Sequence, residues 1–439
     1  MEWSDFIDSV YPTFIESNYQ LCTDSRALKP GDVFLCLKGD RFDGNQFAVQ
    51  AIEQGARLVI VDSEALKIDN RFLYVENSLI ALQQLAKHHF AQLSCKKIIV
   101  GGSNGKTTTK EVSKTVLSAA GITLATPGNW NNHIGVPLTL LSITPSHEYA
   151  IIELGTNHPG EMKVLCDLIS PDAGIITNIG KEHLEGFGDI ETVAKEESEV
   201  YLSLMSSHGL AIVNIDDSWL NSMKKRLDKQ LTISTLNKDA NFYVDIHDEM
   251  PLLTFDFYHN QVNVGSFSST LSGRYNAYNL LFGSALGVFY GLDAHQSMSL
   301  ACQYVPSNNR SEWRTINGIQ IFLDAYNANP SSMTFAIESF ATLKGNKQLF
   351  LGDMLELGDH SETEHKALLD LCTSLGIEQN TFIVGDEFCH ACPNHPYRFK
   401  TIDSLLAWLD THPIETEYAF IKGSRGIKME RVLEHFQSK

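Results

Sequence analysis

A glycine-rich loop that ends in Gly105-Lys106-Thr107 constrains the possible folds of this chain more than any other segment. The apolar residues 98–100 precede the loop, and a helical pattern begins at Lys106. This order of strand, turn and helix is typical of a phosphate-binding loop, because glycine lets backbone N–H groups close on phosphate oxygens. Lys106 adds a mobile positive charge, and the Thr107 hydroxyl can hold Mg²⁺. The usual eight-residue pattern is incomplete, since Val100 stands where its first glycine is expected.

Length and composition restrict the class of protein. The chain has 439 residues, too many for one hydrophobic core, which predicts two to four domains. No apolar run approaches the roughly 20 residues that a bilayer crossing needs. A formal net charge of −19 argues against nucleic-acid binding, although local N–H groups and a metal can still hold an anionic nucleotide. The acidic start of the chain lacks a signal-peptide pattern. We therefore expect a cytoplasmic protein that binds neither nucleic acid nor membrane.

The order of strands and helices predicts an α/β protein of three domains. Residues 1–95 form a small mixed α/β domain in this interpretation, and residues 96–304 form a central P-loop domain with a doubly wound parallel sheet. Residues 305–439 repeat the doubly wound pattern and predict a Rossmann-like C-terminal domain. A more polar segment, residues 237–269, alternates with period two, which predicts antiparallel strands inserted before the helix at Asn276.

Two polar side chains follow predicted strands of the central domain. Glu153 ends the strand at residues 149–153, and His183 follows the strand at residues 174–177. Because ligands bind at the carboxyl ends of parallel strands, both side chains are expected to converge on the crevice of the phosphate loop. A carboxylate at Glu153 can share a Mg²⁺ with Thr107. For His183, a structural role and a metal or phosphate role both remain open.

Three asparagine-rich segments stand out as candidate ligand contacts. They are residues 129–137, 276–279 and 324–330. Side-chain amides at such density either form turns or bind a polar ligand. Taken together, the three segments predict a ligand pocket shared by domains.

These segments resemble the ATP-dependent Mur ligases of peptidoglycan synthesis, and the resemblance covers all three predicted domains. Gly102-Ser103-Asn104-Gly105-Lys106-Thr107-Thr108 resembles the shortened phosphate loop of that family. Six further segments match in the same order, at residues 129–141, 153–157, 183–188, 326–330, 352–358 and 422–425. Within the family, they are most similar to the members that add D-alanyl-D-alanine.

The resemblance implies an ATP-dependent acid–D-amino-acid ligase that uses ATP and Mg²⁺. ATP phosphorylates the terminal carboxylate of UDP-N-acetylmuramoyl-tripeptide, and the amine of D-Ala-D-Ala then attacks the acyl phosphate, which releases ADP and phosphate. The N-terminal domain is expected to bind the UDP substrate and the central domain ATP. The C-terminal domain is expected to bind D-Ala-D-Ala and to close on ATP. A monomer that serves cell-wall biogenesis, cell shape and cell division is implied as well.

The resemblance also assigns roles to individual residues. Lys106, Glu153, His183 and Glu197 are the implied catalytic residues, and Thr107, Glu153, His183 and Glu197 the implied metal ligands. Nucleotide contacts are expected from Gly102, Ser103, Asn104, Gly105, Lys106, Thr107, Thr108, Asn276, Asn279, Arg310 and Asp324. Substrate contacts are expected from Ser25, Arg26, Asp43, Asn132, Thr156, Asn157, Asn329, Ser331 and Asp353.

The chain departs from the family pattern at three positions. Tyr275 and Asn45 each stand where the family commonly has histidine. Glu197 stands where the family carries a carbamylated lysine that presents a carboxylate to a second Mg²⁺. Glu197 could supply that carboxylate directly, although on a shorter arm. Lys195 is the competing candidate for carbamylation, but a shift of two residues turns it about 200° around a helix.

Other functions remain open at this point. Another Mur ligase or a folylpolyglutamate-type ligase would share the mechanism, although the segment Asp24-Ser25-Arg26 resembles a UDP-binding region that the folate enzymes lack. A nucleotide-gated binding protein without ligase activity is the alternative from another class. The third residue of the tripeptide, meso-diaminopimelate or lysine, is not specified by the sequence.

Overall fold

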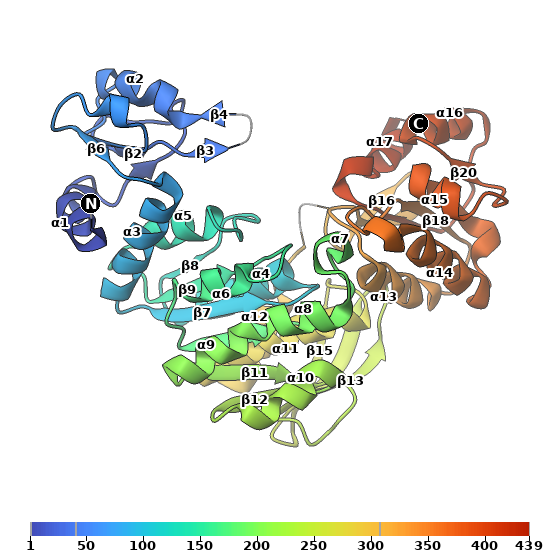
Figure 1. Cartoon of the computed structure of the whole chain (residues 1–439). Helices are drawn as coiled ribbons and strands as arrows, with labels where there is room; N and C mark the ends of the chain where they lie inside the picture. Colours follow the sequence, from blue (N-terminus) through green and yellow to red (C-terminus); the bar gives the residue numbers. More distant parts are fainter. Residues whose placement is uncertain (1, 40–41, 307–308, 439) are drawn as a thin grey trace.

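The computed structural model describes residues 2–39, 42–306 and 309–438. Three bodies follow one another along this part of the chain, each built on its own sheet (Figure 1). We call them the N-terminal body (α1 to α3), the central body (β7 to α12) and the C-terminal body (β16 to α17). The N-terminal and C-terminal bodies stand apart from each other, and each lies next to the central body (Figure 1).

The N-terminal body has a parallel sheet with the order β1-β2-β5-β6. Its elements are α1 (Trp3–Glu16), β1 (Leu21–Cys22), β2 (Val33–Leu35), β3 (Lys38–Gly39), β4 (Phe42–Asp43), η1 (Gly44–Phe47), α2 (Ala48–Glu53), β5 (Leu58–Val61), η2 (Glu64–Leu66), β6 (Phe72–Tyr74) and α3 (Ser78–Gln92). Helix α3 joins this body to the central one, since the buried His89 side chain lies 2.7 Å from the Ile143 carbonyl oxygen.

The central body has one sheet with the order β15-β14-β13-β12-β11-β10-β7-β9-β8. Its strands are β7 (Lys96–Gly101), β8 (Thr123–Ala125), β9 (Tyr149–Glu153), β10 (Ala173–Ile176), β11 (Leu210–Asn214), β12 (Gln230–Ser234), β13 (Phe242–Asp248), β14 (Leu253–His259) and β15 (Val262–Ser269). Its helices are α4 (Lys106–Leu117), α5 (Gly135–Leu141), α6 (Glu161–Cys166), α7 (Leu184–Phe187), α8 (Ile190–Glu197), α9 (Glu199–Ser207), α10 (Ser218–Met223), η3 (Lys224–Arg226), α11 (Arg274–Phe289) and α12 (Ala294–Cys302).

Alternate residues of β7 show why the middle of this sheet is apolar throughout. Ile98 and Val100 pack in one hydrophobic cluster, and Ile99 packs in another on the opposite face. A strand covered on both faces needs a continuous apolar run, as predicted for a parallel sheet. The polar segment forms the antiparallel strands β13, β14 and β15, and these extend the central sheet at one edge.

The C-terminal body has a sheet with the order β16-β17-β21-β18-β19-β20, parallel except for the β16–β17 pair. Its strands are β16 (Glu312–Ile316), β17 (Ile319–Asp324), β18 (Lys347–Gly352), β19 (Thr381–Val384), β20 (Arg398–Phe399) and β21 (Tyr418–Lys422). Its helices are α13 (Pro330–Ala341), η4 (Gly358–His360), α14 (Ser361–Ser374), η5 (Glu378–Asn380), α15 (Asp386–Ala391), α16 (Ile402–Thr411), η6 (Arg425–Ile427) and α17 (Glu430–Ser438). None of the helices in the described ranges is both long enough and apolar enough to cross a membrane.

Candidate active site

The glycine-rich loop links the end of β7 to the start of α4 at Lys106. Gly102 and Gly105 have φ of +109° and +84°, a backbone conformation that side chains with a Cβ rarely adopt. A Cβ on Gly102 would also lie 2.2 Å from the Thr177 hydroxyl, because the end of β10 packs directly against the loop. The neighbouring strand therefore fixes the course of the loop, and glycine is required there on two counts.

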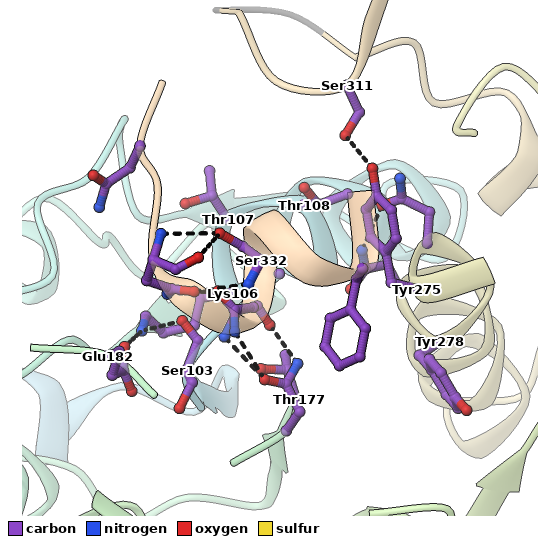
Figure 2. A pocket seen from close by; sticks show the side chains of 18 of the residues that line it. Ser103, Lys106, Thr107, Thr108, Thr177, Glu182, Tyr275, Tyr278, Ser311 and Ser332 are labelled. Atoms are coloured by element: carbon purple, nitrogen blue, oxygen red, sulfur yellow. Dashed lines mark hydrogen bonds and ion pairs between the residues drawn. The ribbon is translucent and has the colours of Figure 1, made fainter. Parts of the chain in front are cut away.

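A cavity of about 930 Å³ opens between the central and C-terminal bodies, and the loop forms part of its wall (Figure 2). Many of the predicted nucleotide and metal contacts line it. These are Ser103, Asn104, Gly105, Lys106, Thr107, Thr108, Glu153, His183, Asn276, Asn279, Arg310 and Asp324. Asn329, one of the predicted substrate contacts, lines the cavity as well. Residues from segments far apart in the sequence thus share one cavity, as the asparagine-rich segments predicted.

Glu153 lies beside the loop at the floor of the cavity. Its Oε1 accepts hydrogen bonds from the Thr107 hydroxyl at 3.1 Å and from Asn131 Nδ2 at 2.8 Å. Its Oε2 is buried, accepts no hydrogen bond from the residues that the structure describes, and lies 3.7 Å from the Lys110 ammonium group. Sequence reasoning gave no role to Asn131 or Lys110, although Lys110 stands one helical turn after Lys106. The arrangement keeps an anionic oxygen next to the Thr107 hydroxyl.

Lys106 is held mainly by groups of its own loop and by one carboxylate. Its ammonium group donates to the Gly102 carbonyl oxygen, lies 3.4 Å from the Ser103 carbonyl oxygen and lies 3.3 Å from Glu182 Oε2 (Figure 2). Burial alone lowers the pKa of Lys106, but the carboxylates around it, of which Glu182 acts most strongly, raise that pKa above its ordinary value. Sequence reasoning missed Glu182, and its only signal was its place beside His183 at a strand end.

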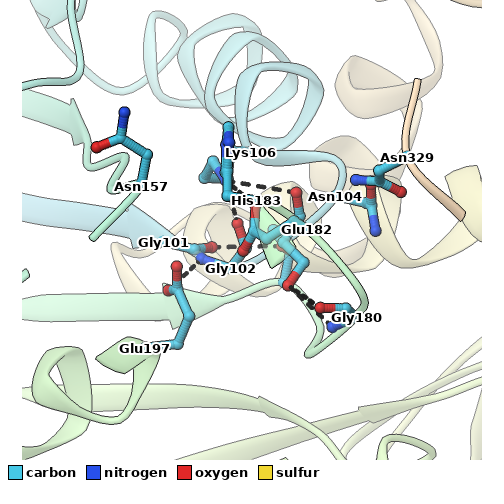
Figure 3. A network of polar contacts seen from close by, with 12 residues as sticks. Gly101, Gly102, Asn104, Lys106, Asn157, Gly180, Glu182, His183, Glu197 and Asn329 are labelled. Atoms are coloured by element: carbon cyan, nitrogen blue, oxygen red, sulfur yellow. Dashed lines mark hydrogen bonds and ion pairs between the residues drawn. The ribbon is translucent and has the colours of Figure 1, made fainter. Parts of the chain in front are cut away.

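Glu197 is buried next to the loop but outside the lining of the cavity. Its Oε2 accepts a hydrogen bond from the Gly102 N–H at 2.6 Å (Figure 3). Burial raises the pKa of the Glu197 carboxyl, and the charge of Glu182 raises it further. Lys195, the competing candidate, is exposed on the other side of α8. Of the two, Glu197 is the residue that faces the loop.

Two asparagines in the first turns of α11 form a chain of hydrogen-bonded amides. Asn279 Nδ2 donates to Asn276 Oδ1 at 2.8 Å, and Asn276 Nδ2 donates to the Ser272 carbonyl oxygen at 2.6 Å. The Tyr275 hydroxyl lies 3.4 Å from the Ser311 hydroxyl of the C-terminal side (Figure 2). This hydrogen-bonded chain fixes both amide orientations at the edge of the cavity.

The C-terminal body adds charged groups to the same cavity. Asp324 accepts hydrogen bonds from Lys422 Nζ at 2.5 Å and from the Ser311 N–H at 3.0 Å. The Arg310 guanidinium carbon lies 3.5 Å from the centre of the Tyr326 ring. Lys422 lay in a matching segment but was given no role from the sequence. Asp324 and Arg310 thus bring one acidic and one basic side chain to the lining of the cavity.

Other predicted substrate residues lie outside this cavity. Asn132 Oδ1 accepts hydrogen bonds from the Ile134 and Gly135 N–H groups at 3.1 and 2.9 Å, in the turn that leads into α5. Thr156 is buried and Asn157 is exposed, and neither lines the cavity. Ser331 Oγ accepts from the Lys181 N–H at 2.9 Å, which joins the two bodies.

Asp353 lies outside the lining of the cavity. Its side chain is buried, and its oxygens accept hydrogen bonds from the Glu387 and Phe388 N–H groups at 3.0 and 2.8 Å, at the start of α15. Burial raises the pKa of the Asp353 carboxyl to about 6. The substrate contact expected at Asp353 stays a prediction, and in this structure its carboxylate accepts the hydrogen bonds of two N–H groups in the first turn of α15.

The residues expected at the UDP group lie in the N-terminal body, away from the cavity. Arg26 is exposed and pairs with Asp24 at 2.7 Å. Asp43 accepts hydrogen bonds from the Asn45 side chain at 2.7 Å and from the Asn45 N–H at 3.0 Å. Ser25 is partly exposed beside them. Asn45, the departure from the family pattern, thus takes part in a local polar network.

The loop, the cavity and the three bodies define a P-loop α/β protein with a site between its second and third domains. Models of the Mur ligase middle domain, the Mur ligase family catalytic domain and the Mur ligase glutamate ligase domain match residues 100–287, 19–90 and 309–387. The UDP-N-acetylmuramoyl-tripeptide–D-alanyl-D-alanine ligase of Escherichia coli strain K12 is 36% identical over 432 residues, which cover 94% of this chain and 93% of that ligase. The chain belongs to the Mur ligase family.

Solved structures agree with this assignment. A crystal structure of MurF from Acinetobacter baumannii matches with a TM-score of 0.86 at 30% identity, over 96% of this chain and 93% of that one. The MurF ligase of Thermotoga maritima in complex with ADP matches with a TM-score of 0.85 at 26% identity, over 95% of this chain and 97% of that one. These neighbours confirm the predicted three-domain α/β fold class and the resemblance on which the predicted roles rest.

Proposed function

We propose that this chain is an ATP-dependent ligase that joins D-alanyl-D-alanine to UDP-N-acetylmuramoyl-tripeptide by an amide bond, in the synthesis of peptidoglycan precursors. The observation that carries this proposal is the similarity to the ligase of that name from Escherichia coli, because it extends over all three bodies of the chain. The relative of known structure that holds ADP supports ATP as the second substrate.

In this proposal the three bodies divide the binding work. The N-terminal domain, residues 1–95, binds the UDP group with Ser25, Arg26 and Asp43. The central domain, residues 96–304, holds ATP, and the C-terminal domain, residues 305–439, brings D-Ala-D-Ala to it. A site between two bodies favours this chemistry, because an acyl phosphate must be kept from water until the amine attacks.

The loop and its neighbours perform the electrostatic work of the reaction. The loop N–H groups and Lys106 hold the phosphates and neutralise the charge that develops during transfer. Asn276 and Asn279 contact the adenine ring, while Arg310 and Asp324 complete the nucleotide site from the C-terminal side. The tripeptide carboxylate receives the phosphoryl group, and the D-Ala-D-Ala amine then displaces it as phosphate.

The residues present suit Mg²⁺, which prefers oxygen ligands and usually binds through one or two carboxylates plus phosphates and water. Thr107 and Glu153 are the proposed ligands, and the buried Glu153 Oε2 accepts no hydrogen bond within the described part of the chain. His183 and Glu197 are the proposed ligands of a second ion. To bind it, His183 must leave Glu356, and Glu197 must leave the Gly102 N–H. Bound Mg²⁺ supplies positive charge at the phosphoryl oxygens. Within the described ranges, no group of three or more His, Cys, Asp or Glu side chains could hold a metal ion by itself.

We also propose that the enzyme acts as a monomer in the cytoplasm, where it binds small-molecule substrates and neither nucleic acid nor membrane. The net charge of −19 supports the exclusion of nucleic acid.

Mass spectrometry of the reaction product tests the proposed function. The purified chain is incubated with ATP, Mg²⁺, D-Ala-D-Ala and UDP-N-acetylmuramoyl-tripeptide that carries either meso-diaminopimelate or lysine. We expect the UDP-linked pentapeptide from at least one tripeptide. A product formed only with another amino acid or with a folate would assign the chain to a different ligase, and tight nucleotide binding without any product would favour the binding protein.

A further inference from the structure

The phosphate-loop lysine already has an anionic partner in this structure. Lys106 Nζ lies 3.3 Å from Glu182 Oε2, and the two side chains are only 14% and 5% exposed. Both residues line the cavity between the central and C-terminal bodies. The carboxylate therefore lies beside the ammonium group that the phosphates of a nucleotide need.

The segment that carries Glu182 is fixed from the other side by the C-terminal body. Lys181 Nζ pairs with Glu364 Oε1 at 2.5 Å, and the Lys181 N–H donates to Ser331 Oγ at 2.9 Å. His183 Nδ1 lies 2.6 Å from Glu356 Oε2. Figure 3 shows Glu182 and Lys106 in the polar network around the loop. The chain neighbours of Glu182 thus hold its backbone against the docked C-terminal body, while its own side chain points to the loop.

A bound phosphate and Glu182 make the same demand on Lys106. Each is an anion that needs the ammonium group, and two anions this close repel each other in a site of low dielectric. A phosphate can take Lys106 only if Glu182 moves away or is neutralised by another cation. A ligand without phosphates meets no such competition.

We propose that Glu182 is a positioning residue that holds Lys106 in the nucleotide-free enzyme and competes with nucleotide phosphates for it. It lowers the affinity for phosphate-bearing ligands and leaves the affinity for the nucleoside part unchanged. The docked C-terminal body keeps the competing carboxylate in place, so phosphate binding and domain docking are coupled. This inference rests on the proposed function in one respect, that the cavity binds a nucleotide.

Calorimetric titration with ADP and with adenosine tests the proposal, in the presence of a chelator so that Mg²⁺ does not contribute. Glu182→Gln keeps the size of the side chain and removes its charge, and Glu182→Ala is the second variant. Glu185→Gln is the matched control, since it removes the same charge from an exposed position three residues further on. Melting curves establish that each variant is folded.

We expect both Glu182 variants to bind ADP about three- to tenfold more tightly than the unmodified chain, the range for one partly buried charge contact. Adenosine affinity should stay within about twofold, and Glu185→Gln should change neither value. Unchanged or weaker ADP binding by the Glu182 variants, or equal tightening of ADP and adenosine, would overturn the inference alone. If the unmodified chain binds no ADP even with Mg²⁺ present, the proposed function fails with it.

Discussion

His183 Nδ1 and Glu356 Oε2 lie 2.6 Å apart across the boundary between the central and C-terminal bodies. Both residues have a left-handed backbone, with φ of 44° and 64°, a conformation that costs about 1–2 kcal/mol for a residue other than glycine. The Glu185 N–H also donates to the Glu356 carbonyl oxygen at 3.1 Å. The hydrogen bond from His183 lowers the pKa of the Glu356 carboxyl. Two strained turns, one from each body, thus meet in one contact. This contact exists only while the C-terminal body is docked on the central body.

Removing the Glu356 side chain should loosen this docking. In Glu356→Ala we expect the amides of residues 183–187 and 354–358 to exchange hydrogen about two- to fivefold faster. The reason is that the free energy of local opening decreases by the contribution of one exposed ion pair. Hydrogen-exchange mass spectrometry measures the effect. Glu434→Ala, an exposed position on α17 of the same body, is the control. Unchanged exchange at both segments would mean that the contact does not hold the bodies together.

Lys110 should stabilise the central body rather than take part in the reaction. Its side chain is fully buried and donates to the Thr126 and Gly128 carbonyl oxygens at 2.7 and 3.0 Å. Lys110→Met leaves these oxygens and Glu153 Oε2 without a cation, so we expect a loss of about 2–4 kcal/mol in the free energy of unfolding. Urea denaturation measures it. Lys114→Met, exposed on the same helix, should change stability by less than about 0.5 kcal/mol.

His365 should make the chain less stable in mild acid. Its side chain is fully buried, its Nε2 accepts the Met354 N–H at 3.0 Å, and its Nδ1 lies 2.7 Å from the Ser361 carbonyl oxygen. Burial lowers the pKa of His365 in the folded chain. Below about pH 6.5 the unfolded state then binds more protons than the folded state. The free energy of unfolding therefore decreases as the pH is lowered.

Urea denaturation at several pH values between about 5.5 and 7.5 measures this decrease in the free energy of unfolding. The decrease should begin at pH ~6.5. In His365→Gln the decline between these values should be smaller than in the unmodified chain, even if the variant is less stable at neutral pH. Parallel curves for the two proteins would show that His365 does not cause the acid sensitivity.

Glu197 should replace the carbamylated lysine of the family. We expect turnover to be independent of bicarbonate, and Glu197→Gln to lose about 100-fold or more in kcat, the usual scale for losing a group that stabilises transition-state charge. Rates with and without added bicarbonate provide the measurement. Activity that rises with bicarbonate and survives Glu197→Gln would assign the role to Lys195.

The sequence predicted the arrangement of strands better than the partners of charged side chains. The strand predicted at residues 149–153 agrees with β9 to the residue, because a continuous apolar run and its flanking turns are local signals. Helix α1 was not predicted, although Phe6, Val10 and Phe14 recur at helical spacing and are fully buried.

Contacts between segments that are far apart in the sequence were not predicted, because no local sequence pattern indicates them. The Lys106–Glu182 pair joins residues 76 positions apart, and Asn329 Nδ2 donates to Asn104 Oδ1 across 225 positions. Such pairs depend on how β10 and the C-terminal body approach the loop, which no local pattern specifies. For the same reason, nothing in the motif around Asp353 indicated that its carboxylate accepts a hydrogen bond from the Phe388 N–H in α15.

Replacement of Lys106 separates nucleotide chemistry from binding of the UDP substrate. Lys106→Ala should abolish turnover, because the phosphates lose their side-chain cation. Binding of UDP-N-acetylmuramoyl-tripeptide should stay largely intact, since its predicted contacts lie in the N-terminal body. Calorimetric titration of that substrate measures this. A variant that fails to fold would show that the role of Lys106 is structural.

Release of phosphate from ATP tests the central claim most directly. The assay contains the purified chain, Mg²⁺ and ATP, with UDP-N-acetylmuramoyl-tripeptide and D-Ala-D-Ala each left out in turn. A ligase that works through an acyl phosphate should release phosphate in sustained turnover only when both substrates are present, with one phosphate for each amide formed. Sustained phosphate release without D-Ala-D-Ala, or none with both substrates, would contradict the account.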